Sequence, residues 1–449
     1  MSLRKRKGVK KRMVDSKKIL IISYHFAPQN KIGAVRMTKL AKYLSRLGYK
    51  VTVLCSAGRE ELRDPTLVRD LEELHDVHVI REWNLIRDRK ERAAVAQHGQ
   101  APADPPKLRR RTGGFVYRFL RTLYLALDQL SDASFYRRGF REIMSTNRRF
   151  DVVLSSYGPL SNHRIARRLK EEGIARQWIA DFRDEVALPF RWQAGMARRY
   201  VRKVGEQADG VNAVSRGVLQ VLGFQDRGKC IPNGFDREDL ERLRSLSLPG
   251  SPLIRFAHCG KLYSGKQNLT PLLTILSKFL REGLLQPGEA QVLYAGDGGA
   301  VMAAQAHTAG VEQMVYDLGM LDRGQSLSLQ RQADVLLIAL WNSQERIGVL
   351  SGKLLEYMMM EKAVICCVPG EVPGSEIKRV MEEIGLGFCW EQARAESDTP
   401  ALEGYLREMI SRARQGRVMG PTVNAAAVER YAYSQIAREF SEWIEKKGR

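Results

Sequence analysis

Short apolar runs, each followed by a loop and then a helix-like segment, recur along most of this 449-residue chain. Lys18–Tyr24 (Lys-Ile-Leu-Ile-Ile-Ser-Tyr) is the first of these runs, and Ala363–Val368 is one of the last. Runs rich in β-branched residues suit strands that are buried on both faces of a sheet. A helix between successive strands, such as the one expected over residues 35–47, places those strands parallel. The sequence therefore predicts an α/β fold built on parallel sheets.

The strand–helix pattern runs through two consecutive stretches, and the polar segment at residues 238–252 separates them. A chain of this length is too long for one hydrophobic core. We therefore expect two Rossmann-like α/β/α domains that face one another across a cleft. The expected division is a basic disordered tail (1–17), a first domain (18–245) with a flexible insertion (87–106), a second domain (253–425), and a C-terminal helix packing back toward the first domain (426–449, within a helical stretch at 425–447).

The chain carries a large excess of positive charge. It has 73 Lys and Arg against 51 Asp and Glu, a net charge of +22. Such an excess predicts an anionic partner, either nucleic acid, anionic lipid or a phosphorylated substrate. No nucleic-acid-binding module is recognisable, which argues against the first of these.

Residues 107–150 form a basic segment, with eleven Lys and Arg against three acidic residues. Apolar residues, among them Phe115, Phe119 and Leu123, recur within it at helical spacing. This pattern is typical of a peripheral helix at an anionic membrane surface. A core-packing helix whose arginines face water is the alternative.

The six cysteines form no Cys-x-x-Cys pair, and most fall in apolar runs. We interpret them as buried free thiols of a reducing cytoplasm. No apolar run has the length of a membrane span, and no hydrophobic core follows the basic N-terminus as in a signal peptide. The expected location is cytoplasmic and peripheral on the inner face of the plasma membrane. The sequence contains no His/Cys ligand cluster, so it predicts no metal site.

The segment at residues 348–368 contains the main candidate ligand site. Ser351 is a suitable N-cap for a helix that begins at Gly352 and ends near Met360. A helix N-terminus beside Lys353 suits a phosphate. The carboxylate of Glu356, one turn further on, can accept hydrogen bonds from a ribose diol. An ordinary amphipathic helix with a solvated Glu–Lys pair is the alternative interpretation.

Two further candidates follow predicted strands of the first domain. Gly33 lies in the loop after the first strand and would let the backbone approach a phosphate. That loop lacks the Gly-x-Gly-x-x-Gly pattern, so a nicotinamide cofactor is unsupported. Arg183 and Asp184 follow the predicted strand 177–181 directly, and opposed charges at such a position indicate a site. A surface salt bridge is the alternative there.

The chain resembles the retaining glycosyltransferases of the GT-B fold, family 4. Among these it is similar to the bacterial branch that builds exopolysaccharide, O-antigen of lipopolysaccharide and related surface glycans. The likeness covers roughly residues 18–443. The motifs that carry it are Tyr24-His-Phe-Ala-Pro28 with Gly33 and Arg36, Leu47-Gly-Tyr-Lys-Val-Thr-Val53, Asp181-Phe-Arg-Asp184, Ile231-Pro-Asn-Gly-Phe-Asp236, Gly260-Lys-Leu-Tyr263 with Lys266, and Gly352-Lys-Leu-Leu-Glu-Tyr357.

The resemblance implies a metal-independent transfer from a UDP- or GDP-sugar donor, bound mainly by the second domain, to a lipid-linked or saccharide acceptor. The donor is a substrate, and no other cofactor is implied. The resemblance also implies the roles of individual residues. Lys261 and Lys266 would neutralise the diphosphate, Ser351, Gly352 and Lys353 would contact phosphate or ribose, Glu356 would hold the ribose hydroxyls, Gly33 would lie under the diphosphate, Asn233 would line the cleft, and Asp184, Arg183 and His163 would face the sugar or acceptor.

The chain departs from the family pattern at one position. The family commonly has a second Glu eight residues before the ribose Glu, where this chain has Gly348. Either Glu345 substitutes for it or this branch manages without it. A catalytically silent binding protein of the same fold at the membrane surface is therefore the second hypothesis, although the retained Lys266 and Glu356 argue against it.

Overall fold

The computed structural model describes most of the two predicted domains. The backbone is described for residues 17–29, 32–57, 64–82, 114–184, 186, 194–344, 350–417, 420–421 and 423–447, and the side chains of residues 114–129 are not described. The predictions for residues 1–16, for the insertion 87–106 and for Glu345 and Gly348 lie outside the described residues. The predicted apolar stripe that includes Phe115, Phe119 and Leu123 also lies outside them.

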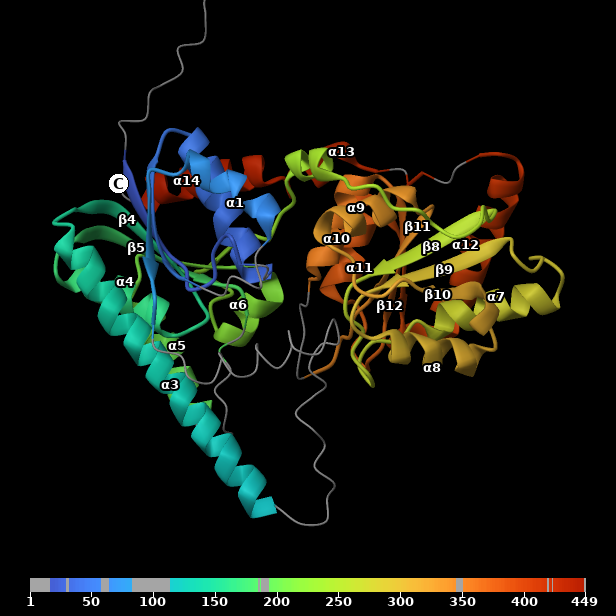
Figure 1. The fold of residues 1–449 in the computed structure, drawn as a ribbon, viewed down its shortest axis with the longest axis horizontal. Helices are drawn as coiled ribbons and strands as arrows, with labels where there is room; N and C mark the ends of the chain where they lie inside the picture. The colour runs from blue at the N-terminus through green and yellow to red at the C-terminus, as the bar shows by residue number, and fades with distance from the viewer. Residues whose placement is uncertain are drawn as a thin grey trace, which may run out of the picture.

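The structure has two sheets of parallel strands flanked by helices, which confirms the predicted two-domain GT-B architecture (Figure 1). The first sheet has seven strands in the order β3-β2-β1-β4-β5-β6-β7, and the second has six in the order β10-β9-β8-β11-β12-β13. The strand order reverses between β1 and β4 in the first sheet and between β8 and β11 in the second. Open α/β sheets bind ligands beside the carboxyl ends of strands at such points.

The first domain contains strands β1 to β7 and the helices around them. The strands are β1 (Lys18–Ile22), β2 (Lys50–Ser56), β3 (Asp76–Ile80), β4 (Phe150–Ser156), β5 (Ala175–Phe182), β6 (Gly210–Ala213) and β7 (Lys229–Cys230). The helices are α1 (Ile32–Arg46), α3 (Gly114–Ser145), α4 (Ser161–Glu171), α5 (Ala194–Gln207) and α6 (Arg216–Leu222), with 3₁₀ turns η2 (Pro65–Leu67), η3 (Arg69–Glu73) and η5 (Arg237–Arg242).

The second domain repeats the arrangement with strands β8 to β13. The strands are β8 (Ile254–Cys259), β9 (Ala290–Ala295), β10 (Val315–Asp317), β11 (Val335–Ala339), β12 (Ala363–Val368) and β13 (Gly387–Glu391). The helices are α7 (Thr270–Arg281), α8 (Gly299–Ala309), α9 (Arg323–Gln332), α10 (Gly352–Met360), α11 (Glu376–Ile384) and α12 (Ala395–Arg414), followed by α13 (Ala425–Glu429) and α14 (Tyr433–Lys447); 3₁₀ turns η6 (Glu312–Met314) and η7 (Gln392–Arg394) complete the list.

The central predicted strands, such as β1 and β12, are buried on both faces, as their composition requires. Alternate residues of β1 enter two different cores, with Ile19 and Ile21 in one and Leu20 and Ile22 in the other. In the second domain β12 is divided in the same way between two cores. Apart from the exposed first residue of β1, the side chains of these two strands are buried, so the strands can present polar groups to a ligand only near their carboxyl ends.

The helix predicted over residues 425–447 is interrupted, and the interruption is part of the connection between the domains. It divides into α13 and α14, and between them Ala432 forms a parallel bridge with Phe235. The N–H of Phe235 donates to the carbonyl of Tyr431 at 2.9 Å, and the N–H of Tyr433 donates to the carbonyl of Phe235 at 2.9 Å. The α14 helix then packs beside α1, within the core of the first domain (Figure 1).

Candidate active site

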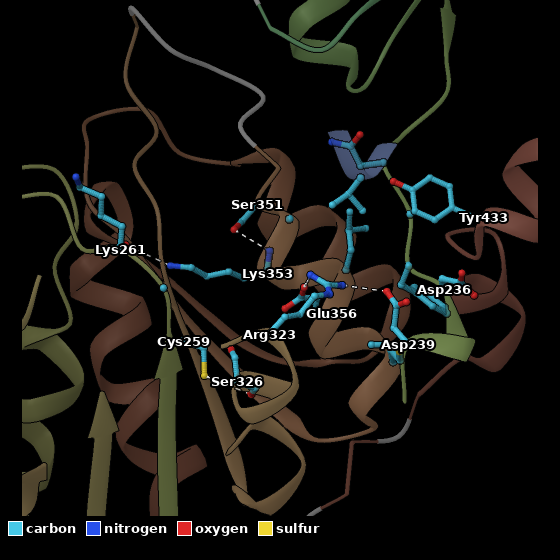
Figure 2. Close-up of a pocket in the computed structure, with 18 of the residues that line it drawn as sticks. Asp236, Asp239, Cys259, Lys261, Arg323, Ser326, Ser351, Lys353, Glu356 and Tyr433 are labelled. Atoms are coloured by element: carbon cyan, nitrogen blue, oxygen red, sulfur yellow. Dashed lines mark hydrogen bonds and ion pairs between the residues drawn. The ribbon is translucent and has the colours of Figure 1, made fainter. Parts of the chain in front are cut away.

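A cavity of about 420 Å³ lies between the two domains, within the size range of small-molecule sites. Its described lining comes from six places in the chain, namely Val35 of α1, the turn before η5 with Asp239, the end of β8 with the loop after it, the start of α9, the first two turns of α10, and Tyr433 (Figure 2). The second-domain segments meet because β8 lies at the reversal of strand order and α10 follows the adjacent strand β11. The cavity therefore occupies the position expected for a ligand site in this architecture.

Helix α10 presents Lys353 and Glu356 to the cavity, together with Leu355 and Met359, and packs its apolar residues in the core. Ser351 is the N-cap, and its hydroxyl accepts a hydrogen bond from the N–H of Lys353 at 3.2 Å. Leu354 and Met358 are buried, whereas Lys353 and Glu356 line the cavity. The prediction of a capped helix beginning at Gly352 is confirmed.

Glu356 is held by two donors from helix α9. One carboxylate oxygen lies 2.9 Å from Nη1 of Arg323, and the other accepts from Nε2 of Gln330 at 3.1 Å. The second terminal nitrogen of Arg323 lies 3.0 Å from the carboxylate of Asp239 (Figure 2). Burial opposes the charge on Arg323, but Glu356 and Asp239 raise its pKa above the ordinary value of 12.5. The guanidinium therefore links the α10 carboxylate to the segment that joins the domains.

Lys353 extends along the cavity away from Glu356 (Figure 2). Its amine lies 3.0 Å from Nε2 of His258 and 3.3 Å from the carbonyl oxygen of Lys261. Burial lowers the pKa of Lys353 from 10.5 to about 8. A cation in this place, with only neutral hydrogen-bond acceptors, is suited to an anionic ligand group.

Lys261 and Lys266 follow β8 in a loop, and the structure separates them. Lys261 lines the cavity, and its ammonium lies 2.9 Å from the carboxylate of Asp297. Lys266 is exposed, and its ammonium lies 5.7 Å from the centre of the Trp341 ring. Lys266 is not among the described residues that line the cavity.

A buried cluster of charges lies where the first domain meets the interdomain segment. The ammonium of Lys39, on α1, lies within 2.9 Å of the carboxylates of Asp70, Asp236 and Asp239. Lys42, one turn further on, lies 2.9 Å from Asp236. Burial disfavours the charged carboxylate of Asp236, but the two lysines nevertheless hold its pKa well below 3.8. Because Asp239 also binds Arg323, ion pairs continue from α1 into the cavity.

The predicted charged pair after β5 is divided between two environments. Arg183 donates two hydrogen bonds to the carbonyl of Tyr157, at 3.0 and 2.7 Å, and Asp184 is exposed. A Cβ added to Gly33 would lie only 1.4 Å from Nη1 of Arg183, so the guanidinium occupies the space that a side chain at position 33 would fill. The first-domain candidates Gly33 and Arg183 are therefore in direct contact.

Asn233 lines the cavity and is held from the first domain. Its side-chain oxygen accepts from Nη1 of Arg36 at 3.2 Å, and Arg36 also pairs with Asp181 at 2.8 Å. The Asp181 side chain is fully buried, which would raise its pKa, but Arg36, Asn212 and Ser156 lower it below 3.8. The acid that begins the Asp181–Asp184 motif thus anchors Arg36 inside the domain.

His163 lies inside the first domain rather than among the described cavity residues. It is 1% exposed, its Nδ1 lies 2.7 Å from the hydroxyl of Ser155, and its ring contacts that of Phe182 at 4.8 Å. Burial lowers its pKa to about 3. A neutral, enclosed imidazole is suited to packing, and its predicted role facing the substrate stays untested.

The structure thus brings together six of the eleven residues predicted for the site. Asn233, Lys261, Ser351, Gly352, Lys353 and Glu356 line the cavity, whereas Gly33, Lys266, Arg183, Asp184 and His163 do not. The sequence analysis missed Arg323, Asp239 and His258, because each acquires its place only through a partner far away in the chain. Within the described ranges no three His, Cys, Asp or Glu side chains are arranged to hold a metal ion, and no helix is long and apolar enough to cross a membrane.

No protein-family model matches the chain, and no curated protein matches it in sequence. Solved structures do match it in fold. The crystal structure of Anabaena HepE in complex with UDP-glucose is 13% identical, with a TM-score of 0.57, and the match covers 96% of this chain and 100% of that one.

Two further structures show the range of proteins that share the architecture. The apo form of the lipopolysaccharide outer core galactosyltransferase WaaB is 14% identical, with a TM-score of 0.55, and 96% and 99% of the two chains are covered. A putative UDP-N-acetylglucosamine 2-epimerase from Listeria monocytogenes is 11% identical, with a TM-score of 0.52, and 96% of each chain is covered. At these identities the matches establish the GT-B fold, which hosts more than one reaction.

Proposed function

We propose that the chain is a glycosyltransferase of the family 4 type, which transfers a sugar from a nucleotide-sugar donor bound in the interdomain cavity. The observation that carries the proposal is the arrangement of Lys353 and Glu356 on the first two turns of α10, where both line one cavity. The α10 N-terminus and Lys353 suit the phosphates, and the Glu356 carboxylate suits the ribose diol. The UDP-glucose bound by HepE supports a UDP-sugar as the first donor to test.

The proposed reaction needs charge stabilisation on the departing diphosphate. The bond between the sugar C1 and the phosphate oxygen breaks, the acceptor hydroxyl oxygen bonds to C1 on the same face, and its proton passes to the departing phosphate. The configuration at C1 is thereby retained. Lys261 and Lys353 would stabilise the developing negative charge without a metal ion, and Lys266 would join them if its loop moves inward. Arg183, packed against Gly33, would approach from the first domain.

We further propose a lipid-linked or saccharide acceptor in the synthesis of a bacterial surface polysaccharide or lipopolysaccharide. The family resemblance and the fold shared with WaaB support it. The net charge of +22 and the basic segment 107–150 support peripheral binding at the inner face of the plasma membrane. Asp184, exposed after β5, and His163 are the first-domain residues to test for acceptor use.

The test begins with thermal unfolding in the presence of UDP, GDP and a panel of their sugars, because a ligand of the native state raises stability by mass action. Donor hydrolysis and transfer are then measured for the wild type, for Glu356→Gln, and for Glu382→Gln on the exposed face of α11 as the matched control. Loss of donor use in the first variant alone supports the proposal. Normal turnover by Glu356→Gln would overturn the site assignment.

Two other outcomes distinguish the competing functions. Nucleotide binding without hydrolysis or transfer would favour the catalytically silent binding protein. Conversion of UDP-N-acetylglucosamine to its 2-epimer in the absence of any acceptor would favour an epimerase, the activity named for the Listeria structure.

A further inference from the structure

Lys353 differs from the other cations around the cavity in the kind of partner that it has. Lys261 pairs with Asp297, and Arg323 pairs with Glu356 and Asp239. The amine of Lys353 contacts a histidine nitrogen and a carbonyl oxygen, and no described carboxylate lies within ion-pair distance of it. Lys353 is half-buried, and an ammonium that is partly removed from water without a counter-ion is unfavourable, so this arrangement suits a cation whose counter-ion is the ligand.

The partner histidine is fixed in one tautomer by its surroundings. His258 is fully buried at the end of β8, and its Nδ1 lies 2.9 Å from the carbonyl oxygen of Leu337. Since a carbonyl can only accept, the ring proton is on Nδ1, and Nε2 carries the lone pair that accepts from Lys353. The ring stacks on Tyr294 with centroids 5.8 Å apart and planes 11° from parallel. Burial, together with Lys353, lowers the pKa of His258 well below 6.5, which keeps it a neutral acceptor.

The path of the lysine side chain is also built into the backbone. Gly260 follows β8 with φ +118°, a conformation that other residues rarely adopt. A Cβ there would lie 2.5 Å from Cε of Lys353. Gly260 therefore leaves the space through which the lysine reaches His258. The Lys353 amine ends beside Lys261, which also lines the cavity (Figure 2).

We propose that His258 is a positioning residue, which holds the Lys353 amine so that the diphosphate of a bound nucleotide becomes its counter-ion and binding is accompanied by proton uptake. This inference rests on the proposed function and adds to it the residue that orients the cation. It also assigns a pH dependence to donor binding, because the amine must be protonated to pair with a phosphate.

The direction of that pH dependence follows from the groups around the amine. Burial lowers the pKa of Lys353 to about 8, and an adjacent diphosphate raises it again. The titratable groups that face it are His258 and Cys259 of β8, Glu356 of its own helix and Cys366 of β12. Burial raises the pKa of Cys259 to about 12 and also raises that of Cys366, so neither thiol titrates near pH 8. UDP affinity should therefore fall above pH 8 by up to about tenfold per pH unit, since one proton is linked to binding.

The test compares UDP with uridine, which lacks the phosphates, by calorimetric titration of the whole chain from pH 7 to pH 9.5. At pH 8, the binding enthalpy is measured in two buffers of different ionisation enthalpy, and the difference between the two values gives the number of protons taken up. The wild type should take up a fraction of a proton with UDP and none with uridine. Lys353→Arg, which stays charged, and Lys353→Met, which stays neutral, should both lose the pH dependence, and only Lys353→Met should also bind UDP weakly at pH 7. Lys446→Met, exposed on α14, is the control.

The histidine variants distinguish positioning from folding. His258→Gln keeps an acceptor oxygen and should retain UDP affinity within about threefold, whereas His258→Leu should weaken UDP about tenfold at pH 7, since roughly 1.4 kcal/mol corresponds to that factor. Uridine affinity should be the same in both, which shows that the site is folded. Two results would overturn this inference and leave the proposed function standing. They are UDP binding that is independent of pH in the wild type, and wild-type UDP affinity in His258→Leu. If the wild type binds neither UDP nor uridine, both this inference and the proposed function are overturned.

Discussion

The guanidinium of Arg323 lies 2.9 Å from the carboxylate of Glu356, although the two residues belong to different helices. Both side chains are about three-quarters shielded from solvent, with exposed fractions of 22% and 27%. The same guanidinium reaches Asp239, in the segment that joins the domains. The residue proposed to hold the ribose is therefore connected, through one arginine, to the segment that joins the domains.

Arg323→Met should weaken nucleoside binding about tenfold, because Glu356 would lose the donor that fixes its orientation; a charge-assisted hydrogen bond of this kind contributes on the order of 1.5–3 kcal/mol. Uridine titration measures the effect. A double-mutant cycle with Glu356→Gln should give a coupling energy in uridine binding of roughly 1 kcal/mol, since the pair is partly exposed. Additive effects of the two substitutions would show that the contact does not position Glu356.

Lys39→Met should destabilise the chain by about 3–5 kcal/mol, because it leaves the buried carboxylates of Asp236 and Asp239 without their shared cation. Urea unfolding at pH 7 measures this change. Lys50→Met, at the exposed start of β2, is the control and should change stability by less than about 0.5 kcal/mol. An equal effect of the two substitutions would contradict the importance of the buried cluster.

Acid should destabilise the chain partly through Asp236. Its pKa in the folded state is held well below its ordinary value of 3.8, so its ion pairs contribute fully above about pH 4 and are lost as the pH falls through the folded pKa. Unfolding free energies measured from pH 7 down to pH 2.5 should therefore fall steeply below pH 4. Asp236→Asn should be less stable at pH 7 and should show a shallower fall. An identical slope in the variant and the wild type would assign the acid sensitivity to other groups, among them Asp181.

Gly33→Ala should separate stability from activity. The new methyl group would overlap the Arg183 guanidinium, which is the far end of a long side chain and can move aside by giving up its hydrogen bonds to Tyr157. The substitution lies in the first turn of α1, where Ala has the better helix propensity by about 1 kcal/mol. The melting temperature should therefore hold or rise, while donor turnover falls as Arg183 is displaced. Unchanged turnover would show that the position of Arg183 does not matter to the reaction.

The parts of the fold that follow from local pattern could be predicted from the sequence. The double burial of β1 and the capped start of α10 at Ser351 depend on residues within a few positions of one another. Helix α1 begins at Ile32, before the expected residue 35, so the local pattern predicted the helix but not the residue at which it begins. The break between α13 and α14 could not be predicted, because it depends on a backbone bridge to Phe235, almost 200 residues earlier.

The part of the candidate site that lies on one helix could be predicted from the sequence, whereas the residues that long-range contacts bring to it could not. Ser351, Lys353 and Glu356 lie on one helix and reach the cavity together. Arg323 joins them through its contacts with Glu356 and, across 84 residues of the chain, with Asp239. The motif around Lys266 predicted a place beside the diphosphate, but the Lys266 ammonium lies over the ring of Trp341. The sequence could not predict this contact, because Trp341 is far away in the chain.

The backbone pairing of Phe235 with Tyr431 and Tyr433 has a mechanical consequence. Two connections joined side by side allow rotation about one axis and resist twisting and sliding, whereas a single flexible tether permits all of these. Phe235 and Tyr433 also line the cavity, so the axis runs beside the place where the ligand would bind. Any relative rotation of the two domains would then follow that axis, and it would change the separation of Arg183 and Lys353 in one reproducible way.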